Sequence, residues 1–218
     1  MKIKNTEIFG NPAFFQKSPA ERSTKGTDMP NVYDFDNTII RTDSGFAFFF
    51  FCLRRHFFRL LPQLPRLGIE LIRFAAARKL GRPLKGDFYL FIHSLPDWQE
   101  EVRLFWEEKA DKLLKPWYLE QLRPDDIIIS CTADFLLRPL CEQLGIRLIG
   151  TRVCTENHRL KGLSCYGEEK VRRLREKYGD IKVGDFYSDS LSDTPLARLA
   201  KRAWFVKGDD ILPWPAEA

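Results

Sequence analysis

Apolar runs of strand length alternate along this chain with segments in which apolar residues recur at helical spacing. Five short runs are predicted as strands: residues 31–35, 126–129, 147–150, 181–187 and 203–206. Three segments with helical periodicity are predicted as helices: residues 136–144, 168–178 and 196–201. Gly145 and Gly179 follow the first two of these segments and suit helix ends. Residues 151–167 alternate instead and predict a hairpin.

The regular alternation of strand and helix predicts an α/β fold, a Rossmann-like parallel sheet with helices on both faces. The helical stretch 45–122 is too long for a single crossover, so we predict a helical cap domain inserted after the first strand. Residues 29–44 and 123–218 are then the core domain. Residues 1–28, rich in Lys, Asn, Ser, Thr, Pro and Gly, are predicted as a flexible N-terminal tail, and Met29 stands just before the first strand.

The composition of the 218-residue chain, 44% hydrophobic and 30% charged, is that of a globular protein with a real core. Its five cysteines are odd in number and contain no CxxC pair, which argues against a disulfide framework or a zinc site. The first thirty residues hold no apolar signal-peptide core. We therefore expect a cytoplasmic protein with reduced thiols.

Polar side chains stand where the predicted strands end. Asp34 and Asp36 close the first strand, Ser130 follows the second, and Asp189 follows the strand at 181–187. Ligands of such sheets bind at the carboxyl ends of the strands. Two carboxylates at positions i and i+2 project to the same side and repel, which indicates a divalent metal, a shared proton, or both. Oxygen ligands favour Mg²⁺, whereas a solvated turn is the simpler alternative.

Each of the other polar positions has a structural reading beside a functional one. Ser130 suits either a helix N-cap or a phosphate-binding hydroxyl. Asp193 suits an N-cap for a helix that begins near Pro195. Lys170 stands at the start of the helix at 168–178, where the helix dipole disfavours a cation, so it serves a partner elsewhere or is a solvated lysine.

Together these residues resemble the four motifs of the haloacid dehalogenase superfamily of phosphohydrolases, over about residues 31–207. Asp34-Phe35-Asp36-Asn37-Thr38 is similar to the first motif, DxDxT, and Ile-Ile-Ser130 to the second. Lys170 is similar to the third motif, and Asp189-x-x-x-Asp193 to the fourth. The helical insertion resembles the cap of subclass IB, which contains the phosphoserine phosphatases. Residues 167–171 and 187–196 are similar to phosphatidylglycerophosphatase C relatives, although Ser188 stands where many members have Gly.

The resemblance implies a magnesium-dependent phosphatase that works through an aspartyl phosphate. Asp34 would attack phosphorus, and Asp36 would act as the general acid and then the general base. Mg²⁺ would be held by Asp34, the backbone carbonyl of Asp36, and Asp189. Ser130 and Lys170 would hold the other phosphoryl oxygens. Asp193, which would orient Lys170 or a metal-bound water, and Thr38 are expected around this centre.

The cap carries the clue to the substrate. Residues 54–85 hold seven arginines, two lysines and one acid, in a chain whose formal net charge is +5, and they follow the apolar run 46–53. A cap core with a solvated basic face and a basic aromatic surface that meets anionic lipid are both open. Nucleic acid is not expected, because no binding motif accompanies the charge. The expected substrate is an anionic, amphiphilic phosphomonoester such as phosphatidylglycerophosphate.

Asp43 keeps a different substrate class open, a small soluble phosphate ester of the phosphoserine type. An acid at this spacing after the first motif contacts the substrate amino group in phosphoserine phosphatases. Two further alternatives concern the activity itself. One is a lipid-surface binding protein without catalysis, and the other is a phosphotransferase that uses the same aspartyl phosphate.

Overall fold

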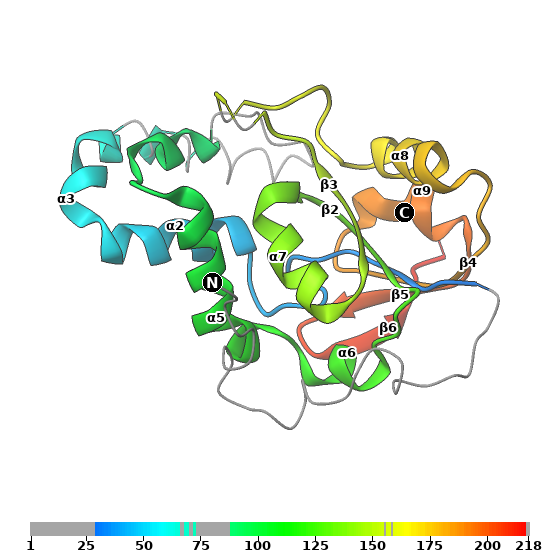
Figure 1. The fold of residues 1–218 in the computed structure, drawn as a ribbon. Helices are drawn as coiled ribbons and strands as arrows, with labels where there is room; N and C mark the ends of the chain where they lie inside the picture. The colour runs from blue at the N-terminus through cyan, green and yellow to red at the C-terminus, as the bar shows by residue number, and fades with distance from the viewer. Residues whose placement is uncertain are drawn as a thin grey trace, which may run out of the picture.

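The structure is a computed structural model that describes residues 29–65, 68–69, 72, 88–154, 156–157 and 159–216. Its centre is one six-stranded sheet of order β3-β2-β1-β4-β5-β6 (Figure 1). The strands are β1 (Val32–Tyr33), β2 (Ile127–Ala133), β3 (Arg147–Thr151), β4 (Val183–Ser188), β5 (Ala200–Lys207) and β6 (Asp210–Pro213). The first five are parallel, and β6 pairs antiparallel with β5.

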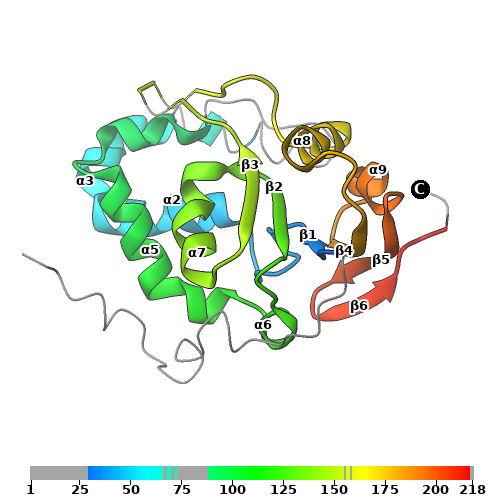
Figure 2. The ribbon, with the colours of Figure 1, turned by 45° about the vertical axis from the view of Figure 1, so that its right-hand side comes forward.

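The helices fall into an inserted group and a group that follows the second strand. Between β1 and β2 lie α2 (Ser44–Arg55), α3 (Phe57–Leu60), the 3-10 helices η2 (Leu61–Gln63) and η3 (Phe88–Ser94), α5 (Trp98–Leu113) and α6 (Pro116–Gln121). After β2 come α7 (Asp134–Leu144), α8 (Glu168–Tyr178), the 3-10 helix η4 (Leu191–Asp193) and α9 (Thr194–Ala197). Helices α2, α3 and α5 form a lobe beside the sheet, away from β4–β6 (Figures 1 and 2).

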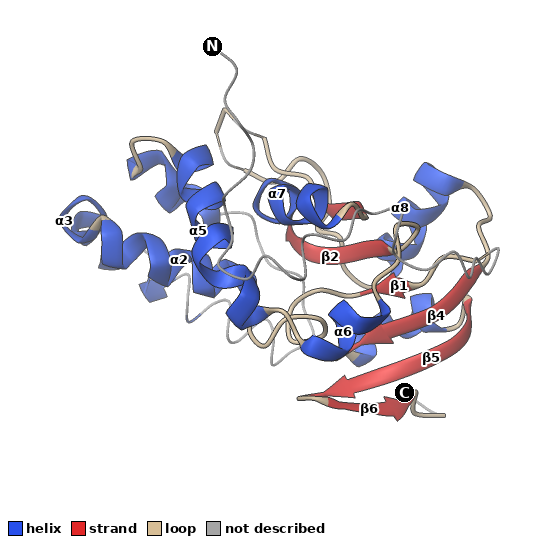
Figure 3. Cartoon of the chain, turned by 60° about the horizontal axis from the view of Figure 1, so that its bottom comes forward, coloured by secondary structure: helices blue, strands red, loops and turns tan. Residues whose placement is uncertain are grey.

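Both faces of the sheet are covered by helices. Successive strand residues point to opposite sides and therefore enter two different buried clusters. Tyr33, Ile128 and Tyr187 belong to one buried cluster, which also contains residues of α2, α5 and α7. Their strand neighbours Val32, Ile127, Ile129 and Phe186 belong to a second cluster, which contains residues of α8 and α9. The predicted parallel sheet with helices on both faces is thereby confirmed (Figure 3).

Several predicted boundaries were wrong. The second strand continues through Ser130 to Ala133, and the helix predicted at 196–201 is instead the short α9, because β5 already starts at Ala200. Residues 203–206 are not the last strand, since a turn at Gly208, whose φ is +63°, leads into β6. The predicted hairpin at 151–167 has one antiparallel bridge, between Val153 and Leu160, among its described residues.

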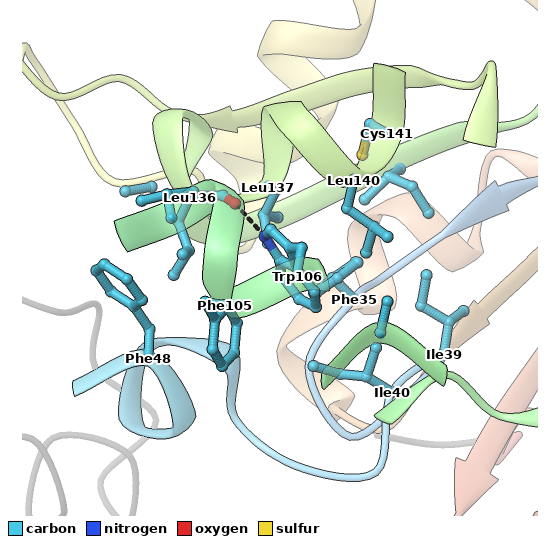
Figure 4. Packing of buried hydrophobic residues seen from close by; sticks show 14 of the residues in the cluster. Phe35, Ile39, Ile40, Phe48, Phe105, Trp106, Leu136, Leu137, Leu140 and Cys141 are labelled. Atoms are coloured by element: carbon cyan, nitrogen blue, oxygen red, sulfur yellow. Dashed lines mark hydrogen bonds between the residues drawn. The ribbon is translucent and has the colours of Figure 1, made fainter. Parts of the chain in front are cut away.

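Phe35, which lies between Asp34 and Asp36 in the first motif, is fully buried and fixes the motif to the hydrophobic core. Its ring meets that of Trp106 of α5 edge-on at 5.9 Å, and the Trp106 indole N–H donates to the carbonyl of Leu136 in α7 at 2.6 Å (Figure 4). The inserted segment and the core therefore share one hydrophobic cluster, which contains Phe35 of the first motif.

The predicted tail, and Arg66, Arg73 and most of the basic segment, lie outside the described residues. Within the described part of the chain, no helix is both long enough and apolar enough to cross a membrane. The division into core and cap domains stays a prediction.

Candidate active site

Asp34 is fixed by the strand pairing that ends at it. Its backbone N–H donates to the carbonyl of Tyr187 at 2.9 Å. The carboxyl ends of the parallel strands β1 and β4 therefore lie side by side. The side chain is largely buried. Burial raises the pKa of Asp34 to about 6, against the opposing effect of the Lys170 ammonium. A carboxylate here needs a cation to stay ionised.

Lys170 supplies that cation from the first turn of α8. Its Nζ donates to Asp34 Oδ1 at 2.8 Å and to Asp193 Oδ2 at 2.7 Å, and the side chain is almost completely buried. Burial alone would lower the pKa of Lys170, but the carboxylates of Asp193 and Asp34 outweigh it and raise that pKa above its usual value. Lys170 is therefore a charged, buried link between the first and fourth motifs.

Asp193 is positioned by a hydroxyl as well as by this lysine. It occupies the N-cap position of α9, yet its carboxylate caps no backbone N–H there. Ser188 Oγ donates to the same Oδ2 at 2.7 Å and accepts from the backbone N–H of Ser190 at 3.1 Å. The serine that departs from the family pattern thus has a defined place in the network.

Both carboxylate oxygens of Asp36 accept hydrogen bonds. Oδ1 accepts from the Ser44 N–H at 2.7 Å, and Oδ2 accepts from the Thr132 hydroxyl at 2.5 Å. Burial and then the negative charge of Asp43 raise the pKa of Asp36 to about 7, against the effect of these hydrogen bonds. A carboxyl group with such a pKa can give and take a proton near neutrality.

Thr38 ties the fourth motif to the first. The Asp189 backbone N–H donates to Thr38 Oγ1 at 2.9 Å, and this hydroxyl lies 3.4 Å from Asp189 Oδ1, to which it donates. Thr38 is fully buried. Asp189 is thereby held against the loop that carries Asp34 and Asp36.

Ser130 and Asp43 make local contacts. Ser130 Oγ, which is buried, accepts from the Thr132 backbone N–H at 3.1 Å. Asp43 caps α2, because its Oδ1 accepts from the Phe46 N–H at 3.0 Å. This N-cap role was not predicted from the sequence, and the same carboxylate also acts on Asp36 through its charge.

The predicted magnesium ligands are compatible with a bound cation. Among the described residues, no three or more His, Cys, Asp or Glu side chains lie together in an arrangement that could hold a metal ion. The predicted set uses only two carboxylates, those of Asp34 and Asp189, with a backbone carbonyl. Asp34 Oδ2 accepts no hydrogen bond from any residue that the structure describes. An ionised oxygen left in this way suits a hard cation.

Sequence reasoning missed Thr132 and Ser44, the two donors to Asp36. Thr132 lies two residues beyond Ser130 in β2, but it was placed outside the predicted strand. Ser44, the first residue of α2, contributes its backbone N–H, and a hydrogen bond of its side chain also lowers the pKa of Asp36. The hydroxyl side chains of Thr132 and Ser44 were the only signal of these contacts in the sequence.

Comparison with known proteins identifies the family. Residues 32–198 match the family of haloacid dehalogenase-like hydrolases. The chain is 30% identical over 187 residues to Protein CicA of Caulobacter vibrioides, with 78% of this chain and 82% of that protein covered. It is 26% identical over 207 residues to a histidinol-phosphatase of Neisseria meningitidis serogroup C, with 82% and 90% covered.

Solved structures show the same fold at lower identity. A protein of unknown function from Bordetella pertussis Tohama I superposes with a TM-score of 0.61 at 20% identity, covering 80% of this chain and 88% of that one. A phosphoserine phosphohydrolase-like protein from Francisella tularensis gives a TM-score of 0.50 at 18% identity, with 80% and 86% covered. The chain belongs to the haloacid dehalogenase-like hydrolases, and within that family it is a phosphoric monoester hydrolase.

Proposed function

We propose that this enzyme is a magnesium-dependent phosphatase that hydrolyses phosphomonoesters through a phosphoryl group carried on Asp34. The observation that carries the proposal is the buried Lys170 ammonium, which contacts both Asp34 and Asp193. A lysine in this position keeps Asp34 ionised and nucleophilic in a site that would otherwise favour its neutral form.

In the first step an Asp34 carboxylate oxygen attacks phosphorus, and the bond from phosphorus to the ester oxygen breaks. Asp36 gives its proton to the departing alkoxide. In the second step Asp36 takes a proton from water, the water oxygen attacks phosphorus, and Asp34 is released with inorganic phosphate. Such proton transfer contributes about 10²–10⁴-fold to the rate.

The other residues hold the phosphoryl group and the acids in place. Lys170 and Ser130 would bind phosphoryl oxygens, and Asp193 would keep Lys170 oriented. Asp34, the Asp36 carbonyl and Asp189 would hold Mg²⁺, which supplies charge stabilisation to the phosphoryl oxygens when bound. Thr38 would keep Asp189 in that position.

Magnesium dependence gives the direct test of this function. Purified protein freed of metal by a chelator is expected to release no phosphate from p-nitrophenyl phosphate, and added Mg²⁺ is expected to restore release. Ca²⁺ serves as the control, because it prefers more ligands at longer distances. Full activity in the chelated protein would contradict the magnesium requirement.

The substrate we propose is an anionic, amphiphilic phosphomonoester such as phosphatidylglycerophosphate, selected by a cap domain of subclass IB. Phe58 of α3 is 85% exposed, and Phe50 of α2 is 58% exposed. In the sequence Arg54 follows Phe50 by four residues and Arg59 follows Phe58 directly. Arg54 and Arg55 also approach Glu108 of α5. Flotation with vesicles that contain anionic lipid should recover the protein, and vesicles of neutral lipid should not.

A small soluble phosphate ester that carries an amine is the second candidate. Asp43 favours it, since its carboxylate lies at the start of α2 close enough to Asp36 to raise the pKa of that acid. The relative named as a histidinol-phosphatase points in the same direction. A panel of phosphorylated amino alcohols, phosphoserine and lysophospholipid phosphates would separate the two classes by kcat/KM.

The pH profile tests the proposed role of Asp36. Because Asp36 must be protonated to act as the acid, activity is expected to fall as the pH rises through its pKa. Asp43→Asn removes a charge that raises this pKa, so the falling limb should move to lower pH, while Asn still caps α2.

Thr132→Val provides the opposite control, since the Thr132 hydrogen bond lowers the pKa of Asp36. Its falling limb should move to higher pH. Limbs that coincide with that of the wild-type enzyme in both variants would exclude Asp36 as the group that titrates.

A further inference from the structure

Lys115 is a second buried lysine, and the phosphoryl-transfer steps do not use it. It lies between α5 and α6, and its side chain is only 2% exposed. Its Nζ donates to the carbonyl of Asn37 at 2.7 Å and to the carbonyl of Gly208 at 2.5 Å. These acceptors are 78 and 93 residues away in the chain. A buried ammonium is costly unless it is fully hydrogen-bonded, so its place here calls for an explanation.

The carbonyl that Lys115 holds belongs to the middle of the first motif. Asn37 has a left-handed backbone, with φ of +56°, and its N–H donates to the Thr42 carbonyl at 3.2 Å. It separates Asp36 from Thr38, the residue whose hydroxyl contacts Asp189. A shift of the Asn37 carbonyl would therefore turn the acid and the Asp189 contact together.

Lys115 also belongs to the linker through which the inserted segment rejoins the core. Its backbone N–H donates to the Ile39 carbonyl at 2.9 Å, and Ile40 and Leu114 form an antiparallel bridge. The outgoing and returning linkers are thus paired beside the motif. The α5–α6 connection also lies beside the turn between β5 and β6 (Figures 1 and 3).

The charges around Lys115 come from three elements. Burial lowers its pKa, Asp209 of the β5–β6 turn and Asp189 oppose that effect, and Arg41 of the outgoing linker adds to it. Arg41 and Asp209 themselves form an exposed ion pair at 3.0 Å. Among Lys115, Arg41 and Asp209, Lys115 is the residue whose side chain donates to a carbonyl of the first motif.

We propose that Lys115 is a positioning residue for the phosphatase site, holding the Asn37 carbonyl and thereby the orientation of Asp36 from the linker of the inserted segment. This inference rests on the proposed function. It implies that the position of the returning linker and the geometry of the acid are mechanically connected.

Lys115→Met keeps the apolar stem and removes both hydrogen bonds. A displaced Asp36 should matter most for an alkyl phosphate, whose leaving oxygen needs a proton, and least for p-nitrophenyl phosphate, whose leaving group is a weak base. We expect kcat for the alkyl ester to fall about 10- to 100-fold. The p-nitrophenyl ester should lose only a few-fold, and KM should stay similar for both.

Arg41→Ala is the matched control, because it removes the exposed pair at the same corner and should leave the ratio of the two kcat values unchanged. Lys115→Gln retains one donor and should fall between wild type and Lys115→Met, which keeps the test open if the methionine variant folds poorly. A lower melting temperature with an unchanged ratio would overturn the inference. An inactive wild-type enzyme would instead overturn the proposed function.

Discussion

Asp34→Asn is expected to abolish turnover, with a loss of at least about 10⁴-fold in kcat, because the amide cannot attack phosphorus. The substitution keeps the shape of the side chain, and Lys170 retains Asp193 as its partner. The melting temperature should therefore change by only a few degrees. Phosphate release and thermal unfolding, measured on one preparation, would separate lost chemistry from lost structure.

Asp43→Asn is the control for this experiment, since it makes the same chemical change at a nearby carboxylate. With p-nitrophenyl phosphate, which carries no amine for Asp43 to contact, it should retain most of the turnover at the optimum of its own pH profile. Acid quenching of the wild-type enzyme during turnover, followed by mass spectrometry, should place one phosphoryl group on the peptide that contains Asp34. Retained turnover in Asp34→Asn, or the phosphoryl group on another peptide, would contradict the assignment of the nucleophile.

The parts of the site that could be predicted from sequence are those set by strand ends. Asp34 comes directly after Val32 and Tyr33, and Asp189 follows the strand predicted at 181–187. Parallel strands bring their carboxyl ends to one edge of the sheet. The contacts of Lys170 with Asp34 and Asp193 are found in the structure. The catalytic and metal-binding roles of these residues stay predictions.

Other parts depend on contacts that the local pattern does not contain. Ser130, Cys131 and Thr132 look like the polar end of a strand, yet β2 continues to Ala133 and pairs it with Thr151. Lys115 stands in a Lys-Pro-Trp sequence that suits an exposed linker. Its buried ammonium is hydrogen-bonded to the carbonyls of Asn37 and Gly208, which are distant in the chain. The residues next to Lys115 in the sequence do not indicate these partners.

The inserted segment shows the same division. The apolar run 46–53 is correctly helical, and four of its residues, Phe48, Phe49, Phe51 and Cys52, are buried in the core. Helical spacing alone does not tell which face meets the sheet and which meets solvent, so Phe50 was not separable from its neighbours. Tertiary packing against α5 makes that choice.

Lys170→Met is expected to damage both activity and stability, since it leaves the carboxylates of Asp34 and Asp193 buried without their cation. Breaking a buried ion pair in this way costs about 3–5 kcal/mol. Lys177→Met on the same helix is the control, because Lys177 is exposed and donates to one carbonyl, of Leu148, at 3.0 Å. Urea unfolding should show a cost below about 1 kcal/mol for that control, and kcat/KM should fall at least about 10³-fold only in Lys170→Met.

The pH dependence of this cost identifies its cause. Without Lys170, the positive charge that lowers the pKa of Asp34 is lost, so this pKa rises further above its wild-type value of about 6. The loss of stability relative to wild type should then be smallest below about pH 6 and should grow as the pH rises from there through the further raised pKa of Asp34. Adding Asp193→Asn removes one of the two stranded charges, so the double variant should be less destabilised than the sum of the single variants. A pH-independent cost, or strict additivity, would mean that Lys170 acts by filling space and not by its charge.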